Sequence, residues 1–332
     1  MTNRQHPLGS GFTAASTATD VLAGIDLAGR QIVVTAGHVG LGLETTRALS
    51  RAGASVVIGA RSPGRAAAAV ADLPGVEVRP LDLLDPRSVD AFAEAYLDTG
   101  RPLHVLVNNA GIMGGPLVRD GRGYEAQLAT NHLGHFRLTD GLLPALRAAS
   151  GARVVEVSSW GHHLSDIRWD DPHFEDGAYD GMVAYGQSKT ANVLFAVELD
   201  RRWSDDGIRG YALHPGGILD TNLAPSITDE QWQQMGLLDE HGKVVNDPDR
   251  DLKTPQQGAS TSVWAATSPL LDGIGGVFLQ NNDIAPLEDI DAPLSIDFGS
   301  GPLQTSVGVT RYAVDPESAQ RLWDLSEKLS AG

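Results

Sequence analysis

A tyrosine and a lysine stand four positions apart in the run GMVAYGQSKT, residues 181–190. On a helix this spacing places Tyr185 and Lys189 on one face, about one turn apart, so a phenol and an ammonium can share one site. A phenol has an ordinary pKa of about 10 and is a poor acid–base catalyst near neutral pH, but a nearby cation favours the phenolate and lowers that pKa. The pair therefore predicts proton transfer, against the alternative of two surface residues on an ordinary helix.

The elements that must position this pair are predicted by an alternation of apolar and helical stretches. Strand-like runs are QIVVTAG, SVVIGAR, VEVRPLDL, LHVLVNNAG and ARVVEVSS, and residues 209–214 and 276–280 add two more. Between them, helices are predicted in ETTRALSRAG, PGRAAAAVADL, SVDAFAEAYLD, a long stretch around 124–149, another around 183–203, and TPQQGASTSVWAATS. Short β-rich runs that alternate with helices of about 10–15 residues indicate βαβ units. The sequence therefore predicts an α/β protein with a doubly wound parallel sheet.

The regions outside this alternation suggest the domain organisation. Residues 1–28 are expected to form a helix-bearing N-terminal extension, and residues 29–332 a single domain. Residues 220–253 are long and irregular for a connection inside a compact domain, so we expect a substrate lid there. Residues 287–310, rich in Pro, Gly, Asp and Ser, are expected to form a surface loop.

The composition argues against several functional classes. The 332 residues carry a formal net charge of −17, which repels nucleic acid and anionic membrane surfaces. The absence of cysteine excludes disulfides, thiolate metal sites and cysteine nucleophiles. No segment approaches the roughly 18 consecutive apolar residues of a membrane span, and the N-terminus lacks a secretory pattern. We expect a cytoplasmic protein with a small-molecule substrate, and a homo-oligomer is compatible with these features.

Several conspicuous side chains have an ordinary interpretation. His162, His163 and His173 lie near three aspartates in the sequence but show no metal-ligand spacing, so we expect pocket lining or a solvated loop and no metal. Trp160, Trp232 and Met235 either line an apolar pocket or pack in the core or lid.

A glycine-rich loop follows the first predicted strand in TAGHVGLG, residues 35–42. Glycines allow the backbone to approach a phosphate, and the N-terminus of the following helix presents free N–H groups to it. The common GxGxxG pattern is not met, and a plain tight turn is the alternative. The position directly after the first strand favours a nucleotide site.

After the second predicted strand, Ala60 stands where an acidic residue would bind an unphosphorylated adenosine ribose, and Arg61 is next to it. A cation at this place favours a 2′-phosphate through charge-assisted hydrogen bonds, which indicates NADP. A solvated loop arginine is the alternative interpretation. Asp82 in LDL and the run NNAG, residues 108–111, end further strands at the same predicted edge, although each alone equally fits turn chemistry.

Taken together, TAGHVGLG, NNAG, NHLGHF (131–136), VEVSSW (155–160), YGQSK (185–189) and HPGG (214–217) resemble the short-chain dehydrogenase/reductase family in order and separation. The resemblance covers about residues 29–332 and implies the Rossmann fold, a three-layer α/β/α arrangement. NHLGHF, the long interval between the serines and the tyrosine, and HPGG are most similar to the branch of retinol dehydrogenases and WW-domain oxidoreductases.

The resemblance implies a set of catalytic residues and a set of cofactor-binding residues. The catalytic set is Asn131, Ser159, Tyr185 and Lys189. The cofactor-binding set is Gly37, His38, Gly40, Leu41, Gly42, Arg61, Asp82, Leu83, Asn109, Ala110, Gly111, Tyr185, Lys189, Pro215, Gly216 and Ile218. In this scheme Lys189 binds the nicotinamide ribose, Ser159 holds the substrate oxygen, and Asn131 holds a water that connects Lys189 to solvent.

The sequence departs from the family pattern at two places. Ala36 stands where the family usually has glycine, so its methyl group either tightens the turn or weakens the cofactor fit. Asp220 stands where the family has a threonine that contacts the nicotinamide carboxamide, and Thr221 comes one place later.

The expected function is an NADP(H)-dependent oxidoreductase that interconverts an alcohol and a ketone or aldehyde. The material between Ser159 and Tyr185 and in 220–253 favours a bulky, mostly apolar substrate. One alternative is a catalytically idle NADP-binding sensor or scaffold. Another is a nucleotide-sugar epimerase or dehydratase of the extended branch, although the spacing around Val39 and Gly40 fits the classical type better.

Overall fold

Eight strands form one sheet in the part of the chain that this computed structural model describes, residues 4–219, 223, 228–294 and 306–331. Their order across the sheet is β3 (Val76–Pro80), β2 (Ser55–Ala60), β1 (Gln31–Thr35), β4 (Val105–Asn108), β5 (Ala152–Val157), β6 (Ile208–His214), β7 (Val277–Gln280) and β8 (Asp283–Ile284). All neighbouring pairs are parallel except β7 and β8. The order reverses between β1 and β4, where a crevice for ligands opens in such sheets. The predicted doubly wound α/β class is confirmed.

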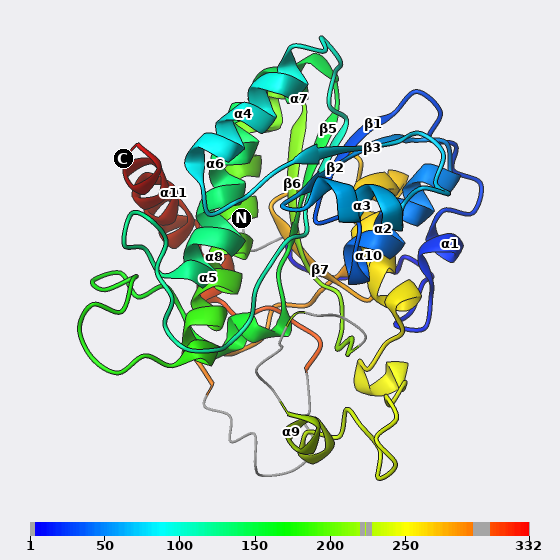
Figure 1. The fold of residues 1–332 in the computed structure, drawn as a ribbon. Helices are drawn as coiled ribbons and strands as arrows, with labels where there is room; N and C mark the ends of the chain where they lie inside the picture. The colour runs from blue at the N-terminus through cyan, green and yellow to red at the C-terminus, as the bar shows by residue number, and fades with distance from the viewer. Residues whose placement is uncertain (1–3, 220–222, 224–227, 295–305, 332) are drawn as a thin grey trace.

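Helices cover both faces of the sheet (Figure 1). One face carries α1 (Ala18–Val21), α2 (Gly40–Arg51), α3 (Pro63–Ala69) and α10 (Pro255–Thr267). The other carries α4 (Pro86–Leu97), α6 (Gly134–Gly141), α7 (Leu143–Ala148), α8 (Gly181–Trp203) and α11 (Pro316–Ser330). Alternate residues of a strand point to opposite faces, so Ile32 and Val34 of β1 enter one core and Val33 the other. This arrangement explains why the strands are apolar almost throughout.

The stretch around 124–149 is not the single long helix that the sequence suggested. It consists of α5 (Ala126–Leu128), a π-helical turn (Ala129–Leu133), α6 and α7. Pro144 in the first turn of α7 lacks an N–H and cannot continue the hydrogen-bond ladder of α6. The wider π turn contains Asn131, one of the predicted catalytic residues.

Helix α8 is buried along almost its whole length. Every residue from Ala184 to Asp200 is shielded from solvent, because the helix lies between the sheet and α11. Asp180 begins the helix by accepting hydrogen bonds from the N–H groups of Met182 and Val183. Among the helices that the structure describes, none combines the length and apolar character that crossing a bilayer requires.

The N-terminal residues bind the last strands of the sheet. The Gln5 side chain donates hydrogen bonds to the carbonyl groups of Phe278 and Ala285, at 2.8 and 2.6 Å. The N–H groups of Leu8, Gly9 and Ser10 donate to the Asp283 carboxylate. These contacts cover the edge of the sheet, which would otherwise present unpaired backbone groups.

The two irregular regions differ in how they pack. In the region 287–310, Ile290 is half-buried, the remaining residues of 289–294 are exposed, and Val309 is fully buried against the core beneath α8. The described part of 220–253 contains α9 (Asp229–Gln234), which lies apart from the sheet at the bottom of Figure 1. Its apolar side chains form a separate small cluster of Met235, Leu237 and Leu252, with Leu219, Trp232 and Val245 packed against it.

Candidate active site

A cavity of about 300 Å³ opens at the carboxyl ends of the central strands. Most of the residues predicted from the sequence line it: Gly40, Leu41, Gly42, Asn109, Ala110, Gly111, Ser159, Tyr185, Lys189, Pro215, Gly216 and Ile218. The predicted residues that do not line it are Gly37, His38, Arg61, Asp82, Leu83 and Asn131. The fold thus brings the glycine-rich loop, the serine and the tyrosine–lysine pair around one space.

Tyr185 and Lys189 lie on one face of α8, as their spacing predicts. The Lys189 ammonium is 5.4 Å from the centre of the Tyr185 ring, and its Nζ donates a 3.0 Å hydrogen bond to the Val157 carbonyl. Gly161 allows the backbone to pass close to the ring, since a Cβ there would lie 2.8 Å from Tyr185 Cε1. Both ionisable side chains are therefore held inside the protein rather than on a surface helix.

The electrostatics of Tyr185 differ from the expectation that a neighbouring cation lowers its pKa. Burial raises the pKa of Tyr185 to about 12, and a hydrogen bond with the Ser159 side chain only partly opposes this effect. Burial also lowers the pKa of Lys189 to about 8, opposed by the carboxyl group of Glu156. The cost of placing a charge in a poorly solvated site outweighs the local attractions. Tyr185 is consequently a neutral phenol at neutral pH.

Asn131 holds the backbone beneath the cavity. Its side-chain amide donates to the Ile112 carbonyl and to Ser188 Oγ, at 3.0 and 2.9 Å, and its oxygen accepts from the Ile112 N–H at 2.9 Å. Gly111 makes the approach possible, because a Cβ there would lie 3.3 Å from Asn131 Oδ1. The arrangement ties the loop after β4 to α8, and the water-holding role of Asn131 stays a prediction.

Glu156 is a buried carboxyl that the sequence reasoning missed. It lies on β5, fully buried, and its Oε1 accepts a 2.5 Å hydrogen bond from Asn108 Nδ2 on the neighbouring strand. Burial raises the pKa of Glu156 to about 8, while Asn108 and Lys189 lower it. A carboxyl between the apolar Val155 and Val157 of a predicted strand was the available signal, because an unpaired buried charge is costly.

The glycine-rich loop passes close to the neighbouring strand end. A Cβ at Gly42 would lie 2.5 Å from the Ala36 carbonyl oxygen and 2.6 Å from Asn109 Nδ2, so only glycine fits there. Ala36 adopts a left-handed backbone with φ of 52°, which costs a residue other than glycine about 1–2 kcal/mol. Val39 precedes α2 without a capping side chain, so the first N–H groups of that helix face the loop uncapped.

Basic side chains lie near the end of β2. Arg61 follows this strand and is exposed to solvent. His38 is half-buried, and its pKa is lowered by burial and by the nearby Arg65 guanidinium. Two further predicted cofactor residues have local contacts: the Asp82 carboxylate accepts from the Leu84 N–H, and Leu83 packs where Gly134 lacks a side chain. Their part in coenzyme binding stays a prediction.

The opposite wall of the cavity is apolar. It includes Met113, Leu164, Met182, Leu219, Leu223, Trp232, Met235 and Leu237. Trp232 and Met235 therefore line the cavity as well as packing in the small cluster of the 228–253 region. The departure at Asp220 and Thr221 lies outside the described residues.

The histidines after Ser159 contact backbone carbonyl groups and neighbouring side chains of the protein. The buried His162 and His163 rings bond through Nδ1 to the carbonyl groups of Ser159 and Trp160, and His163 Nε2 lies 2.5 Å from Glu288 Oε2. His173 stacks on the Tyr124 ring at 4.4 Å. Within the described ranges, no group of three or more His, Cys, Asp or Glu side chains is arranged to hold a metal ion.

Known proteins are similar to this chain in sequence and in fold. The family described as short chain dehydrogenase matches residues 30–170. A "Probable oxidoreductase" of Streptomyces lividans is 46% identical over 93% of this chain and 100% of its own length. Retinol dehydrogenase 12 of Bos taurus is 37% identical over 81% of this chain and 82% of its own.

A solved structure also resembles this chain in sequence and fold. The crystal structure of an uncharacterized protein from Mycobacterium Paratuberculosis superposes with a TM-score of 0.69 at 35% identity, covering 96% of this chain and 98% of that one. With the cavity and the residues around it, these similarities identify the chain as a member of the short-chain dehydrogenase/reductase family, in the branch that includes retinol dehydrogenases and WW domain-containing oxidoreductases.

Proposed function

We propose that this oxidoreductase uses NADP(H) to interconvert an alcohol and a ketone or aldehyde on a bulky, mostly apolar substrate. One observation carries the proposal: Ser159, Tyr185 and Lys189 face a single cavity that has the glycine-rich loop on one side and an apolar wall on the other. This arrangement offers a proton donor and an oxyanion partner between a backbone loop suited to a coenzyme and an apolar surface suited to a substrate.

The residues present fit a dinucleotide. Gly40, Gly42 and Gly111 present backbone without a side chain to the cavity, and the uncapped start of α2 offers N–H groups to a pyrophosphate. Arg61, with His38 and Arg65 nearby in the fold, supports a 2′-phosphate on the adenosine ribose. When bound, the coenzyme supplies or accepts the hydride at the carbonyl carbon.

The chain itself supplies the proton chemistry. In carbonyl reduction, the Tyr185 hydroxyl donates its proton to the substrate oxygen as negative charge develops there, and the Ser159 hydroxyl donates a hydrogen bond to the same oxygen. The raised pKa of Tyr185 keeps the phenol protonated for this step. The Lys189 ammonium, 5.4 Å from the ring, stabilises the phenolate that remains. Alcohol oxidation is the reverse sequence.

The apolar wall supports an apolar substrate. Trp232, Met235 and Leu219 belong to a cluster separate from the two cores of the sheet. A segment whose apolar side chains pack on one another and on the cavity can open and close while its end at residues 251–253 stays fixed, so we propose that the region 220–253 is a lid.

The Tyr185→Phe variant should lose carbonyl reductase activity while it still binds NADPH, because only the proton donor is removed. We expect less than about a tenth of the wild-type rate, since such groups typically contribute roughly 10²–10⁴-fold. Initial rates with a panel of ketones, and coenzyme fluorescence for binding, measure the two properties. Tyr124→Phe is the control, because its ring stacks on His173 outside the cavity and should leave the rate unchanged. Activity above that level in Tyr185→Phe would refute the acid–base role.

The Glu156→Gln variant should shift the pH dependence of carbonyl reduction. The Glu156 carboxyl raises the pKa of Lys189, so its removal lowers that pKa, and the alkaline limb set by loss of the ammonium moves to lower pH. The variant should also gain thermal stability relative to wild type as pH rises from 4.5 towards about 8, because over that window the unfolded wild-type chain releases the Glu156 proton while the folded chain keeps it.

Rate–pH profiles and melting temperatures over the same pH range check this prediction. Glu94→Gln, an exposed glutamate on α4, is the control and should leave both profiles unchanged. Profiles of Glu156→Gln that coincide with wild type would show that Glu156 does not influence Lys189.

The Arg61→Ala variant should weaken NADPH binding and leave NADH binding nearly unchanged. Losing a charged hydrogen bond costs about 1.5–3 kcal/mol, which is roughly a 10- to 150-fold increase in Kd. Titration of both coenzymes by fluorescence measures the difference, with Arg51→Ala at the exposed end of α2 as the control. An equal loss for both coenzymes would rule out contact with the 2′-phosphate.

The Trp232→Ala variant should raise KM for a bulky ketone, keep NADPH affinity within about twofold and barely change Tm, because binding rather than core packing is lost. Trp264→Ala is the contrasting variant, since this fully buried tryptophan should cost about 3–5 kcal/mol of stability. Kinetics and thermal melts distinguish them. If Trp232→Ala instead lost stability with KM unchanged, Trp232 would belong to the core and the lid proposal would fail.

A further inference from the structure

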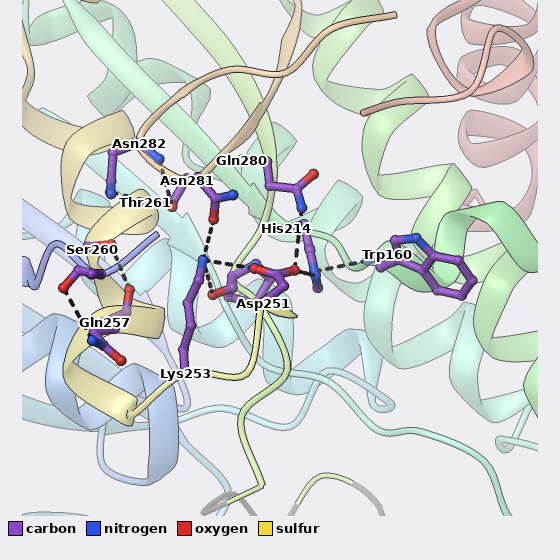
Figure 2. A network of polar contacts seen from close by, with 12 residues as sticks. Trp160, His214, Asp251, Lys253, Gln257, Ser260, Thr261, Gln280, Asn281 and Asn282 are labelled. Atoms are coloured by element: carbon purple, nitrogen blue, oxygen red, sulfur yellow. Dashed lines mark hydrogen bonds and ion pairs between the residues drawn. The ribbon is translucent and has the colours of Figure 1, made fainter. Parts of the chain in front are cut away.

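A carboxylate, an ammonium and an imidazole lie together beside the cavity, where the end of β6 meets residues 251–253 (Figure 2). Asp251 Oδ2 is 2.8 Å from His214 Nε2, and Asp251 Oδ1 is 3.2 Å from Lys253 Nζ. All three residues are buried: Asp251 is 6% exposed, His214 is 5% exposed and Lys253 is 2% exposed. Charges this deeply buried must satisfy one another, because water cannot do so.

The backbone around His214 defines its protonation state. The Trp160 N–H donates a 2.9 Å hydrogen bond to His214 Nδ1, so Nδ1 carries no proton and the proton is on Nε2, facing Asp251. A second proton on Nδ1 would place two hydrogen-bond donors, Nδ1–H and the Trp160 N–H, against each other. The observed contacts therefore require a neutral imidazole, and they place Trp160, the neighbour of Ser159, against the end of β6.

Lys253 ties the cluster to the segment that follows His214. Its Nζ donates to Asn281 Oδ1 at 2.6 Å and to the Pro215 carbonyl at 3.4 Å, and its stem lies against Gly216, where a Cβ would be 2.7 Å from Lys253 Cδ. The backbone is paired as well, because the Gly217 N–H donates to the Asp251 carbonyl at 2.7 Å. Residues 214–217 are thus held from one side by residues 251–253.

Within the cluster, the Lys253 ammonium balances the charge of the Asp251 carboxylate. Burial alone would raise the pKa of Asp251, but His214 and Lys253 lower it to about 2. Another ionisable group near His214 is His162 from the turn after Ser159, and Tyr185, Lys189 and Arg250 line the same cavity as His214. On β7, the neutral Gln280 lies opposite His214 and donates to Asp251 Oδ2 at 3.3 Å.

We propose that Lys253 is a positioning residue. Its ammonium neutralises the Asp251 carboxylate and thereby keeps His214 neutral. A neutral His214 accepts the hydrogen bond from the Trp160 N–H and so holds the Ser159–Trp160 backbone at a constant distance from residues 214–218. A buried ion pair contributes little net stability compared with apolar side chains, so geometry is its main effect. Its consequence for catalysis rests on the function proposed above, because Ser159 and residues 215–218 border the cavity on either side.

The test is the Lys253→Met variant of the full chain. Without the ammonium, the Asp251 carboxylate has only His214 as a cationic partner, so His214 Nδ1 takes a proton from solvent and loses the Trp160 N–H. Nitrogen NMR of the His214 ring at neutral pH should report an unprotonated Nδ1 in the wild type and two protonated ring nitrogens in the variant. The variant's kcat for carbonyl reduction should gain an acid limb, falling about tenfold at low pH and recovering as His214 loses its proton.

Two further variants separate positioning from a purely structural role. In Asp251→Asn/Lys253→Met both charges are removed, so His214 stays neutral and the acid limb should be absent. Lys243→Met, an exposed lysine in the same segment, should behave as wild type. If Lys253→Met fails to fold, the double variant and the wild-type NMR spectrum still decide the matter. An acid limb in Asp251→Asn/Lys253→Met, or a proton on His214 Nδ1 in the wild type at neutral pH, would overturn the proposal.

The NMR measurement does not depend on turnover. A titrating His214 in Lys253→Met without any ketone reduction would leave the positioning inference intact and count against the proposed function. A neutral His214 in Lys253→Met, with normal turnover, would refute the inference alone.

Discussion

The burial of α8 is the constraint on which the rest of the site depends. This helix carries a phenol and an ammonium in its second and third turns, yet the sheet and α11 shield it from water almost throughout. Every polar group on it must therefore find a partner inside the protein. Lys189 bonds to the end of β5, Ser188 accepts from Asn131, and Thr190 donates to the turn after Ser159. The same contacts that satisfy α8 align the residues around the cavity.

Burial also determines the chemical character of the pair. It moves the pKa of Tyr185 up to about 12 and that of Lys189 down to about 8, so each side chain is biased towards its neutral form. Glu156, which is itself buried on β5, counteracts the change at Lys189. The pKa values of the proton donor and of the cation that would stabilise its product are thus set mainly by burial and to a smaller extent by neighbouring charges.

Several loops around the cavity must also pass very close to neighbouring segments of the backbone. Gly42 and Gly111 bring the loops after β1 and β4 against their neighbours, and Gly216 does the same beside Lys253. At Ala36 the chain keeps a left-handed turn without glycine, which shows that the surrounding contacts outweigh the modest strain of a methyl group there. These short distances between strand ends explain how one cavity borders segments that are far apart in the sequence.

Much of the fold and of the site could be predicted from the sequence, because the signals are local. The alternation of strands and helices, the four-residue spacing of Tyr185 and Lys189, and the glycines after β1 depend on neighbouring residues and on helix geometry. The similarity to a known family added Ser159 and Asn131. The break within residues 124–149 was missed, because a π turn and the effect of Pro144 depend on packing as well as on periodicity.

Only the tertiary structure decided which distant groups meet and how well each is solvated. Glu156 faces Asn108 because β4 and β5 pair in parallel, and His214 meets Asp251 and Lys253 because residues 251–253 return to the end of β6. No local pattern encodes these pairs, since they arise from strand order and loop packing. The direction of the Tyr185 pKa likewise depends on burial, which comes from the whole chain closing over α8, whereas the spacing of the pair comes from the sequence alone.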